Sequence, residues 1–489
     1  MSTYESPQPG SLSAPPPIGF LTEGGLVRGA WEWARRLTAR TAFLALALPV
    51  GLFLALAIPP FQGLDEPNHF FRVYSISGGA LVEPVVGSDF GDVLPACVPA
   101  YAFGLYGEAT RPGPFHVSDF FTLPAGCAAQ PAAFVPFDNT AEYSPVSYVP
   151  QSIGVTLTRW LGAPLPVIFY AGRLFALLAY VGLVTLALSI ATRGKWAILV
   201  VGLMPMSLVL GSQYSADGMT IAYALLLVGA VIRCMCDPRA TWRAFLLAAT
   251  AAMALALSKN TYFALAPLLL LVPNRLFPSR WWAVGAKVGA LCLIGLLVGL
   301  WYLEIRKVPP NGPAVGADPP LQIEYILHHK TWFAKFVLDT LFGSGTGYFT
   351  WQGFVSWVGF SRSVAAGTPA PPPLIMAAGI GLVAYAYRVE IPAAISLTKL
   401  IVARALLPVA LAAGNAVLIV TGLYVAAFPV GAQAMWLQGR YLLPLAAVPV
   451  ISLLALQSRE PRERSLIAIL PVVLVLLGYL VVKVPTYFY

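Results

Sequence analysis

Long apolar runs divide most of this chain, and their length limits what it can fold into. Lipid offers no hydrogen-bond partners to the backbone, so segments that cross a membrane must be helices or a closed barrel. These runs are too long for the alternating strands of a barrel. We therefore predict an all-α polytopic membrane protein with about eleven transmembrane helices, each crossing a core of about 30 Å. The predicted spans are 41–60, 165–190, 196–213, 218–233, 243–258, 260–274, 283–302, 371–388, 403–428, 441–457 and 465–483.

Composition agrees with a membrane as the solvent. Of the 489 residues, 58% are hydrophobic and only 10% are charged, whereas a soluble domain is about 25% charged. The formal net charge is +9, but the basic residues fall in short clusters between apolar runs. This pattern indicates membrane topology, and we predict no nucleic-acid partner.

The basic clusters predict which loops face the cytoplasm. Arg28, Arg35, Arg36 and Arg40 precede the first run, so the N-terminus is expected inside, with residues 1–40 as a disordered basic tail. Alternation from there gives basic cytoplasmic loops throughout. The runs between 243 and 274 fit two short spans or one re-entrant hairpin, and both leave the later topology unchanged.

Two predicted outside segments are too long to be simple connectors. Loop 61–164 carries nine acidic and three basic residues and is expected to form a small subdomain within an N-terminal module, 41–302. Loop 303–370 contains the stretch Ile323–Leu341, which is typical of an amphipathic helix. Residues 371–489 complete the membrane part.

Two cysteines, Cys97 and Cys127, fall in the first outside loop, where disulfides are permitted. We predict a bridge between them, closing a loop of about 30 residues and contributing about 3 kcal/mol in the chain-entropy model. Mass mapping without reduction would find both thiols free if this were wrong.

Several polar clusters share the predicted outside face. Asp65, Glu66 and His69 follow the first span, and Asp217 precedes the fourth. Lys259 lies at the turn between the fifth and sixth spans. The motif Gln438-Gly439-Arg440-Tyr441 begins the tenth span. Charge at a membrane boundary is costly unless it is paired or used, so each cluster is a candidate site.

Most of these residues also have a purely structural interpretation. Asp217 follows a Ser-Ala pair before a helix, which is also an ordinary capping signal. Arg440 would equally suit an anchor to lipid phosphate. His328-His329 favours an interfacial position over a metal pair. For Asp65-Glu66, followed by Pro67 and by His69 within one turn, we find no packing purpose.

The chemistry of these residue types points to group transfer. A carboxylate at the membrane boundary can take a proton from an incoming hydroxyl, while Arg and Lys hold phosphate. An acid and a phosphate clamp on one face together suggest a phospholipid-like donor.

The residues that carry a family resemblance are Pro59 to Arg72, with the Asp65-Glu66-Pro67-Asn68-His69 block, Tyr143 to Tyr148, Ser215 to Asp217, Lys259, and the Gln438 to Tyr441 motif. Together they resemble a bacterial family of polytopic membrane proteins of unknown function. That family is similar to the GT-C glycosyltransferases. The resemblance covers most of 41–457.

The resemblance implies a multi-pass protein of the bacterial plasma membrane with an extracytoplasmic active site. It implies transfer, with inversion, of a sugar from a polyprenyl-phosphate carrier to a cell-envelope glycan, lipid or protein. Asp65 would be the catalytic base, with Glu66 as the alternative, and Arg440 and Lys259 would bind the donor phosphate. The residues expected to line the site are His69, Arg72, Tyr143, Tyr148, Asp217, Gln438 and Tyr441.

The resemblance implies no certain cofactor, although some relatives of this fold use a divalent cation at the acidic pair.

Two rival interpretations of the function remain. A transporter or lipid flippase would also use charged residues in a membrane, and a non-catalytic envelope scaffold would suit long aromatic outside loops. We find no inverted repeat that would favour a transporter.

Overall fold

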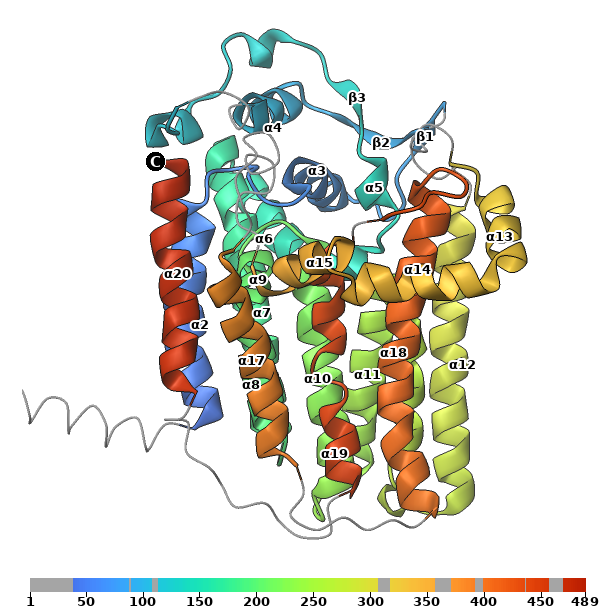
Figure 1. Cartoon of the computed structure of the whole chain (residues 1–489). Helices are drawn as coiled ribbons and strands as arrows, with labels where there is room; N and C mark the ends of the chain where they lie inside the picture. The colour runs from blue at the N-terminus through green and yellow to red at the C-terminus, as the bar shows by residue number, and fades with distance from the viewer. Residues whose placement is uncertain are drawn as a thin grey trace, which may run out of the picture.

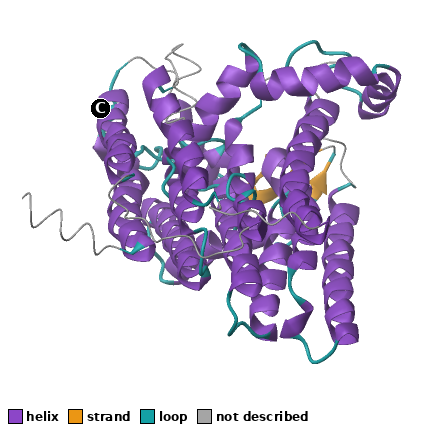
Figure 2. Cartoon of the chain, turned by 60° about the horizontal axis from the view of Figure 1, so that its bottom comes forward, coloured by secondary structure: helices purple, strands orange, loops and turns teal. Residues whose placement is uncertain are grey.

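The computed structural model describes residues 38–87, 89–107, 113–306, 317–356, 371–391, 399–435, 437–456 and 469–489. Helices make up most of the described chain, and its strands are confined to one place (Figure 2). The predicted N-terminal tail lies outside the described residues except for its last three positions. Part of the predicted 303–370 loop lies outside them as well.

Seven helical stretches are long and apolar enough to cross a membrane, and they run side by side (Figure 1). They are α2 (Ala39–Ala57), α7 (Leu165–Ile190), α10 (Ala216–Cys236), α12 (Arg280–Ile305), α18 (Lys399–Ala427), the stretch Gly439–Leu456, which joins η8 (Gly439–Leu445) to α19 (Val450–Leu456), and α20 (Leu470–Phe488). Local signals start several of them: a reciprocal Thr38–Thr41 capping box begins α2, and the Ser279 side chain caps α12. Among these seven stretches helix α10 is the most enclosed, because 78% of its most apolar 18-residue segment is buried.

The other four predicted spans correspond to shorter elements. Span 196–213 is divided into α8 (Lys195–Gly202) and α9 (Pro205–Gly211), because Pro205 has no backbone N–H to continue the helix. The remaining three are α11 (Trp242–Ser258), the 3₁₀ helix η6 (Asn260–Leu271) and α17 (Pro373–Val389). The structure supports a polytopic helical protein with seven candidate spans, and the count of eleven stays a prediction.

A separate layer covers one end of the bundle (Figure 1). Its strands β1, β2 and β3 form a small antiparallel sheet in that order, and no pattern in the sequence predicted these strands. The disulfide between Cys97 and Cys127 is present and joins α4 to η4. The layer comprises α3 (Glu66–Ser77), β1 (Val85–Val86), β2 (Asp89–Leu94), α4 (Cys97–Gly107), η3 (Val117–Phe121), η4 (Cys127–Ala129), β3 (Ala133–Pro136), α5 (Asp138–Ala141), η5 (Pro145–Ser147) and α6 (Val149–Trp160).

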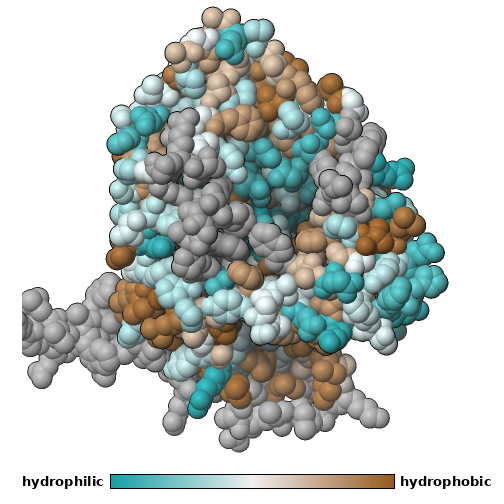
Figure 3. Space-filling model, turned by 45° about the horizontal axis from the view of Figure 1, so that its top comes forward, coloured by the Kyte–Doolittle hydropathy of each residue, from teal (hydrophilic) through white to brown (hydrophobic). Residues whose placement is uncertain are grey.

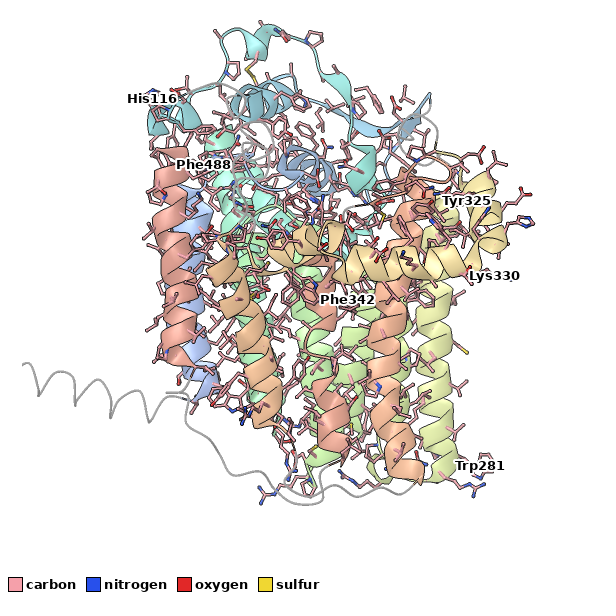
Figure 4. All side chains as sticks on the ribbon, viewed as in Figure 1. His116, Trp281, Tyr325, Lys330, Phe342 and Phe488 are labelled. Atoms are coloured by element: carbon pink, nitrogen blue, oxygen red, sulfur yellow. A yellow bond between two sulfur atoms is a disulfide. The ribbon has the colours of Figure 1, made fainter. Side chains whose placement is uncertain are left out.

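The second long loop also differs in detail from the prediction. In place of one helix over Ile323–Leu341, the chain forms α13 (Pro319–His328) and α14 (Lys330–Phe342), and α15 (Thr346–Val355) follows. His329 interrupts the helix with non-helical φ −120° and ψ 43°. Helix α14, with Lys330 and Phe342 labelled at its ends, lies across the bundle (Figure 4). His329 stacks on Tyr325 with ring centroids 4.2 Å apart, while His328 faces Glu324, so the two histidines do not converge.

Candidate active site

A tight turn after α2 holds Asp65 in place. Asp65 adopts left-handed backbone angles, φ 55° and ψ 21°, which side-chain-bearing residues rarely adopt. Phe61, four residues earlier, also has a positive φ of 66° and is fully buried against Phe169, with ring centroids 4.5 Å apart. Such backbone geometry persists only where surrounding contacts enforce it and is frequent at functional sites. The Asp65 side chain is 45% exposed, so its carboxylate is accessible.

Glu66, the next residue, points elsewhere. Its carboxylate forms two hydrogen bonds with the Arg173 guanidinium of α7, at 2.8 and 2.7 Å, and both side chains are fully buried. It also accepts hydrogen bonds from the backbone N–H groups of Gly63 and Tyr214. Arg173 donates in addition to the carbonyl groups of Ala55, Ile58 and Pro59, which end α2. This geometry makes Glu66 a structural anchor for the turn, and it offers no support for Glu66 as an alternative base.

A charge network joins three segments that are distant in the sequence. The Asp217 carboxylate, in the first turn of α10, forms an ion pair with Lys259 and lies 3.2 Å from Nε of Arg440. Arg440 in turn donates from Nη2 to the Asp65 carboxylate at 3.2 Å. Arg440, Asp217 and Lys259 are almost completely buried, with side chains 4–8% exposed. The four charged residues that the sequence placed on one membrane face therefore meet in one cluster.

These contacts bear on the structural interpretations of Asp217 and Arg440 that the sequence left open. The N-cap of α10 is Ser215, whose side chain accepts from the Asp217 backbone N–H, so the Asp217 carboxylate is not needed as a cap. Arg440 is 4% exposed and faces two carboxylates. Its guanidinium is therefore directed into the charge network and away from the protein surface. Its Nη1 atom is buried and has no hydrogen-bond partner among the described residues.

Glycine explains how Arg440 reaches the network. A Cβ atom at Gly439 would clash with the backbone carbonyl of Thr350 in α15, so the close approach of η8 to α15 requires glycine there. Tyr262 of η6 donates to the backbone carbonyl of Tyr441 at 2.8 Å. These two contacts fix the start of η8, and with it the Arg440 side chain.

Lys259 lies between two aromatic rings and beside a cavity. Its Nζ atom is 4.8 Å from the Tyr143 ring centroid and 4.6 Å from that of Tyr441, both within cation–π range. The cavity has a volume of about 260 Å³. Its apolar lining comes from Ile305 of α12 and from α18. Its polar lining includes one acidic and one basic side chain. The polar residues are Glu142, Tyr143, Lys259, Asn260, Thr261, Tyr262 and Tyr441, and those of α18 are Ile419, Gly422, Leu423 and Ala426. The face of the molecule that carries the covering layer is hollowed, and hydrophilic side chains line the hollow (Figure 3).

His69 is buried next to this network. Its Nδ1 atom is 2.7 Å from the Tyr148 hydroxyl, and its ring stacks on Tyr143 with centroids 6.4 Å apart. Burial lowers the pKa of His69 from 6.5 to about 4, against the opposing effect of the Asp65 charge. His69 is therefore neutral at pH 7. The pKa of Tyr148 is raised well above its usual value by burial, so its hydroxyl stays protonated.

This pKa difference predicts a pH dependence of stability. Between pH 6.5 and pH 4 the unfolded chain binds a proton at His69 that the folded chain does not. The contribution of neutral His69 to the free energy of unfolding is therefore fully present above pH 6.5 and decreases as the pH is lowered. The difference between the two pKa values corresponds to a decrease of about 3 kcal/mol in the free energy of unfolding. Melting temperatures of the wild type and His69→Gln, measured from pH 7.5 to 4.5, should fall less steeply for the variant. Equal slopes would contradict this.

Arg72 and Gln438, which were also predicted to line the site, are not part of the cavity lining. Arg72 is fully buried, pairs with Glu83 and donates to the backbone carbonyls of Leu81 and Tyr143. It therefore supports the Tyr143 segment and does not itself line the cavity. Gln438 precedes η8, and its Oε1 atom is buried without a hydrogen-bond partner in the described part of the chain.

Sequence reasoning missed Arg173 and most of the residues that line the cavity. Arg173 is the partner of Glu66, and its position inside predicted span 165–190 was a usable signal, since a charge within a span must be paired. Gly422 and its neighbours in α18 line the cavity, and nothing in their sequence distinguishes them from other apolar helix residues.

The residues present do not fit a divalent cation at the acidic pair. Glu66 is occupied by Arg173, and the Asp65 carboxylate is 3.2 Å from the Arg440 guanidinium, whose charge would repel a cation. Within the described ranges, no group of three or more His, Cys, Asp or Glu side chains is arranged to hold a metal ion.

Comparison with known proteins identifies a family. Residues 48–449 match the family model described as "Predicted membrane protein (DUF2142)". No significant match was found among curated proteins or among solved structures. Because the matched region spans well over half of the chain and includes Asp65, Asp217, Lys259 and Arg440, the protein belongs to the DUF2142 family of predicted membrane proteins.

Proposed function

We propose that the protein is a glycosyltransferase of the bacterial plasma membrane with its active site on the external face. It moves a sugar, with inversion, from a polyprenyl-phosphate carrier to a hydroxyl group of a cell-envelope glycan, lipid or protein. The observation that carries the proposal is the accessible Asp65 carboxylate, which is joined through Arg440, Asp217 and Lys259 to a cavity with both polar and apolar lining residues.

In this mechanism Asp65 acts as the general base. Its carboxylate takes the proton of the acceptor hydroxyl while the acceptor oxygen forms a bond to the anomeric carbon of the donor sugar. The bond between that carbon and the phosphate oxygen breaks, and polyprenyl phosphate leaves with the electron pair. Because attack and departure occur on opposite sides of the carbon, the configuration inverts.

The leaving phosphate needs positive charge. Arg440 offers a buried Nη1 donor that has no other partner among the described residues, and Lys259 lines the same cavity as the tyrosines. Before the donor binds, Lys259 is paired with Asp217 and Arg440 with both Asp217 and Asp65, so two carboxylates balance the two buried cations. Fixed donors of this kind stabilise developing charge without reorganisation.

The apolar lining of the cavity suits the lipid of the donor. Ile305 and Leu423 come from α12 and α18. Within a membrane, an isoprenyl chain would reach the phosphate between these two helices without passing through water.

Gly422 provides the test of this path. A Cβ atom there would meet nothing within 4 Å, and Gly422 lines the cavity, so Gly422→Leu should fill the space without disturbing the helix. We expect the KM for a long-chain polyprenyl-phosphate sugar to rise at least about tenfold, equivalent to about 1.4 kcal/mol of binding. Initial rates over a donor titration would measure this.

Gly414→Leu is the matched control. Gly414 lies in the same helix α18 with equally open space around its Cα, but it does not line the cavity. Its KM should remain at the wild-type value. Equal KM values for both variants would exclude the α12–α18 path.

A further inference from the structure

A second cavity lies at the opposite end of the bundle. Helix α12 ends at Ile305 beside the candidate active site, whereas its other end, where Trp281 is labelled in Figure 4, borders a cavity of about 480 Å³. Segments η6, η7 (Asn274–Leu276), α12 and α18 contribute to it.

The charges in this cavity are all positive. Lys287 is 8% exposed, and its Nζ atom donates to Oδ1 of Asn274 at 2.9 Å. Arg404 lines the same space from α18. No acidic side chain is among the described residues of the lining. A nearly buried lysine at a membrane boundary without an acidic partner in the described lining is costly, and an anionic ligand held by Lys287 and the exposed Arg404 would reduce that cost.

The other lining residues are apolar. Leu270, Leu271, Val272 and Leu407 lie beside the two basic residues, so one cavity combines a positively charged part with a hydrocarbon-like part. A free inorganic anion would use only the first. An amphiphile with an anionic head and apolar chains would use both.

The depth of the cavity fits a phospholipid head group. Trp281 and Trp282 are each 70% exposed near the start of α12, where tryptophan typically marks the membrane interface. Lys287 follows five residues later, which in an α-helix is about 8 Å further along the axis. A lysine side chain from that depth reaches back to the level of lipid phosphates.

We propose that this cavity binds the phosphate of an anionic phospholipid, with Lys287 and Arg404 contacting the head group and the leucines contacting the acyl chains. The site is separate from the candidate active site and does not depend on the proposed transfer reaction. Basic cavities between membrane helices are suited to such lipids.

Native mass spectrometry of the full chain in detergent, titrated with phosphatidylglycerol or phosphatidylcholine, tests this proposal. The wild type should retain phosphatidylglycerol about tenfold more tightly, as expected for a charge-assisted contact of moderate strength. Lys287→Met with Arg404→Gln should abolish that preference. Arg243→Gln with Arg280→Gln removes two charges at the same membrane end but outside the lining, and should preserve it.

Each outcome decides the question. Competition by millimolar inorganic phosphate would show a site for free anions and would overturn the lipid assignment, as would a preference that survives in the Lys287–Arg404 double variant. If that double variant does not fold, Arg404→Gln alone gives the answer, because Arg404 is exposed and its replacement leaves the packing intact. This single variant should weaken phosphatidylglycerol retention severalfold, and unchanged retention would overturn the proposal.

Discussion

Asp65→Asn is expected to reduce sugar transfer by about 10²- to 10⁴-fold, the usual contribution of a positioned general base. The amide keeps the shape of the side chain and can still accept the hydrogen bond that Arg440 donates at 3.2 Å. It cannot take the acceptor proton. The rate constant for transfer with saturating donor, measured on purified protein of equal melting temperature, checks this directly.

Asp119→Asn is the control for this substitution. Asp119 is an exposed acid in η3, within the same covering layer but outside the charge network. The chemical change is identical, so transfer and stability should both stay at wild-type values. In cells, Asp65→Asn should remove the surface-glycan product while the amount of protein in the membrane is unchanged. Normal product at normal protein level would exclude Asp65 as the base.

The second large effect concerns stability. Glu66→Gln leaves Arg173 as an unpaired charge in a fully buried site and should destabilise the protein by about 3–5 kcal/mol. Thermal unfolding in detergent would show this as a large fall in melting temperature. Asp237→Asn, which breaks the partly exposed pair of Arg233 and Asp237, should cost less than about 1 kcal/mol.

A double variant separates the charge effect from general damage. Glu66→Gln combined with Arg173→Met removes both charges, so it should be less destabilised than the sum of the two single variants. Additive losses would mean that the pair makes no specific contribution, and the turn that holds Asp65 would then need another explanation.

The sequence predicted the broad fold because the membrane leaves few alternatives. Apolar runs of sufficient length correspond to helices such as α7 and α12, since backbone groups in lipid must be paired within the segment. It could not predict the break at His329 or the strands β1 to β3, because two- to six-residue elements outside the membrane depend on tertiary contacts.

The four charged residues of the candidate site were predictable from the sequence, but their geometry was not. Alternation of the loops placed Asp65, Asp217, Lys259 and Arg440 on one face, and the structure joins them in one network. The different roles of two adjacent acids were not predictable, because a left-handed backbone at Asp65 turns its carboxylate away from that of Glu66. Tertiary contacts such as the one with Arg173 decide that orientation.

The rival functions make different demands on this site. A flippase would move the intact lipid-linked sugar across the membrane, and a scaffold would leave the donor unchanged. Neither requires a proton acceptor at Asp65. A sugar-transfer product that forms in wild-type protein and disappears in Asp65→Asn therefore separates the proposed enzyme from both.

The most direct measurement supplies purified protein with a labelled polyprenyl-phosphate sugar and an envelope-derived acceptor, and follows label in the acceptor. Our account predicts transfer by the wild type, free polyprenyl phosphate in equal amount, and inverted configuration at the anomeric carbon. Transfer that occurs only from a nucleotide sugar, or that persists undiminished in Asp65→Asn, would contradict it.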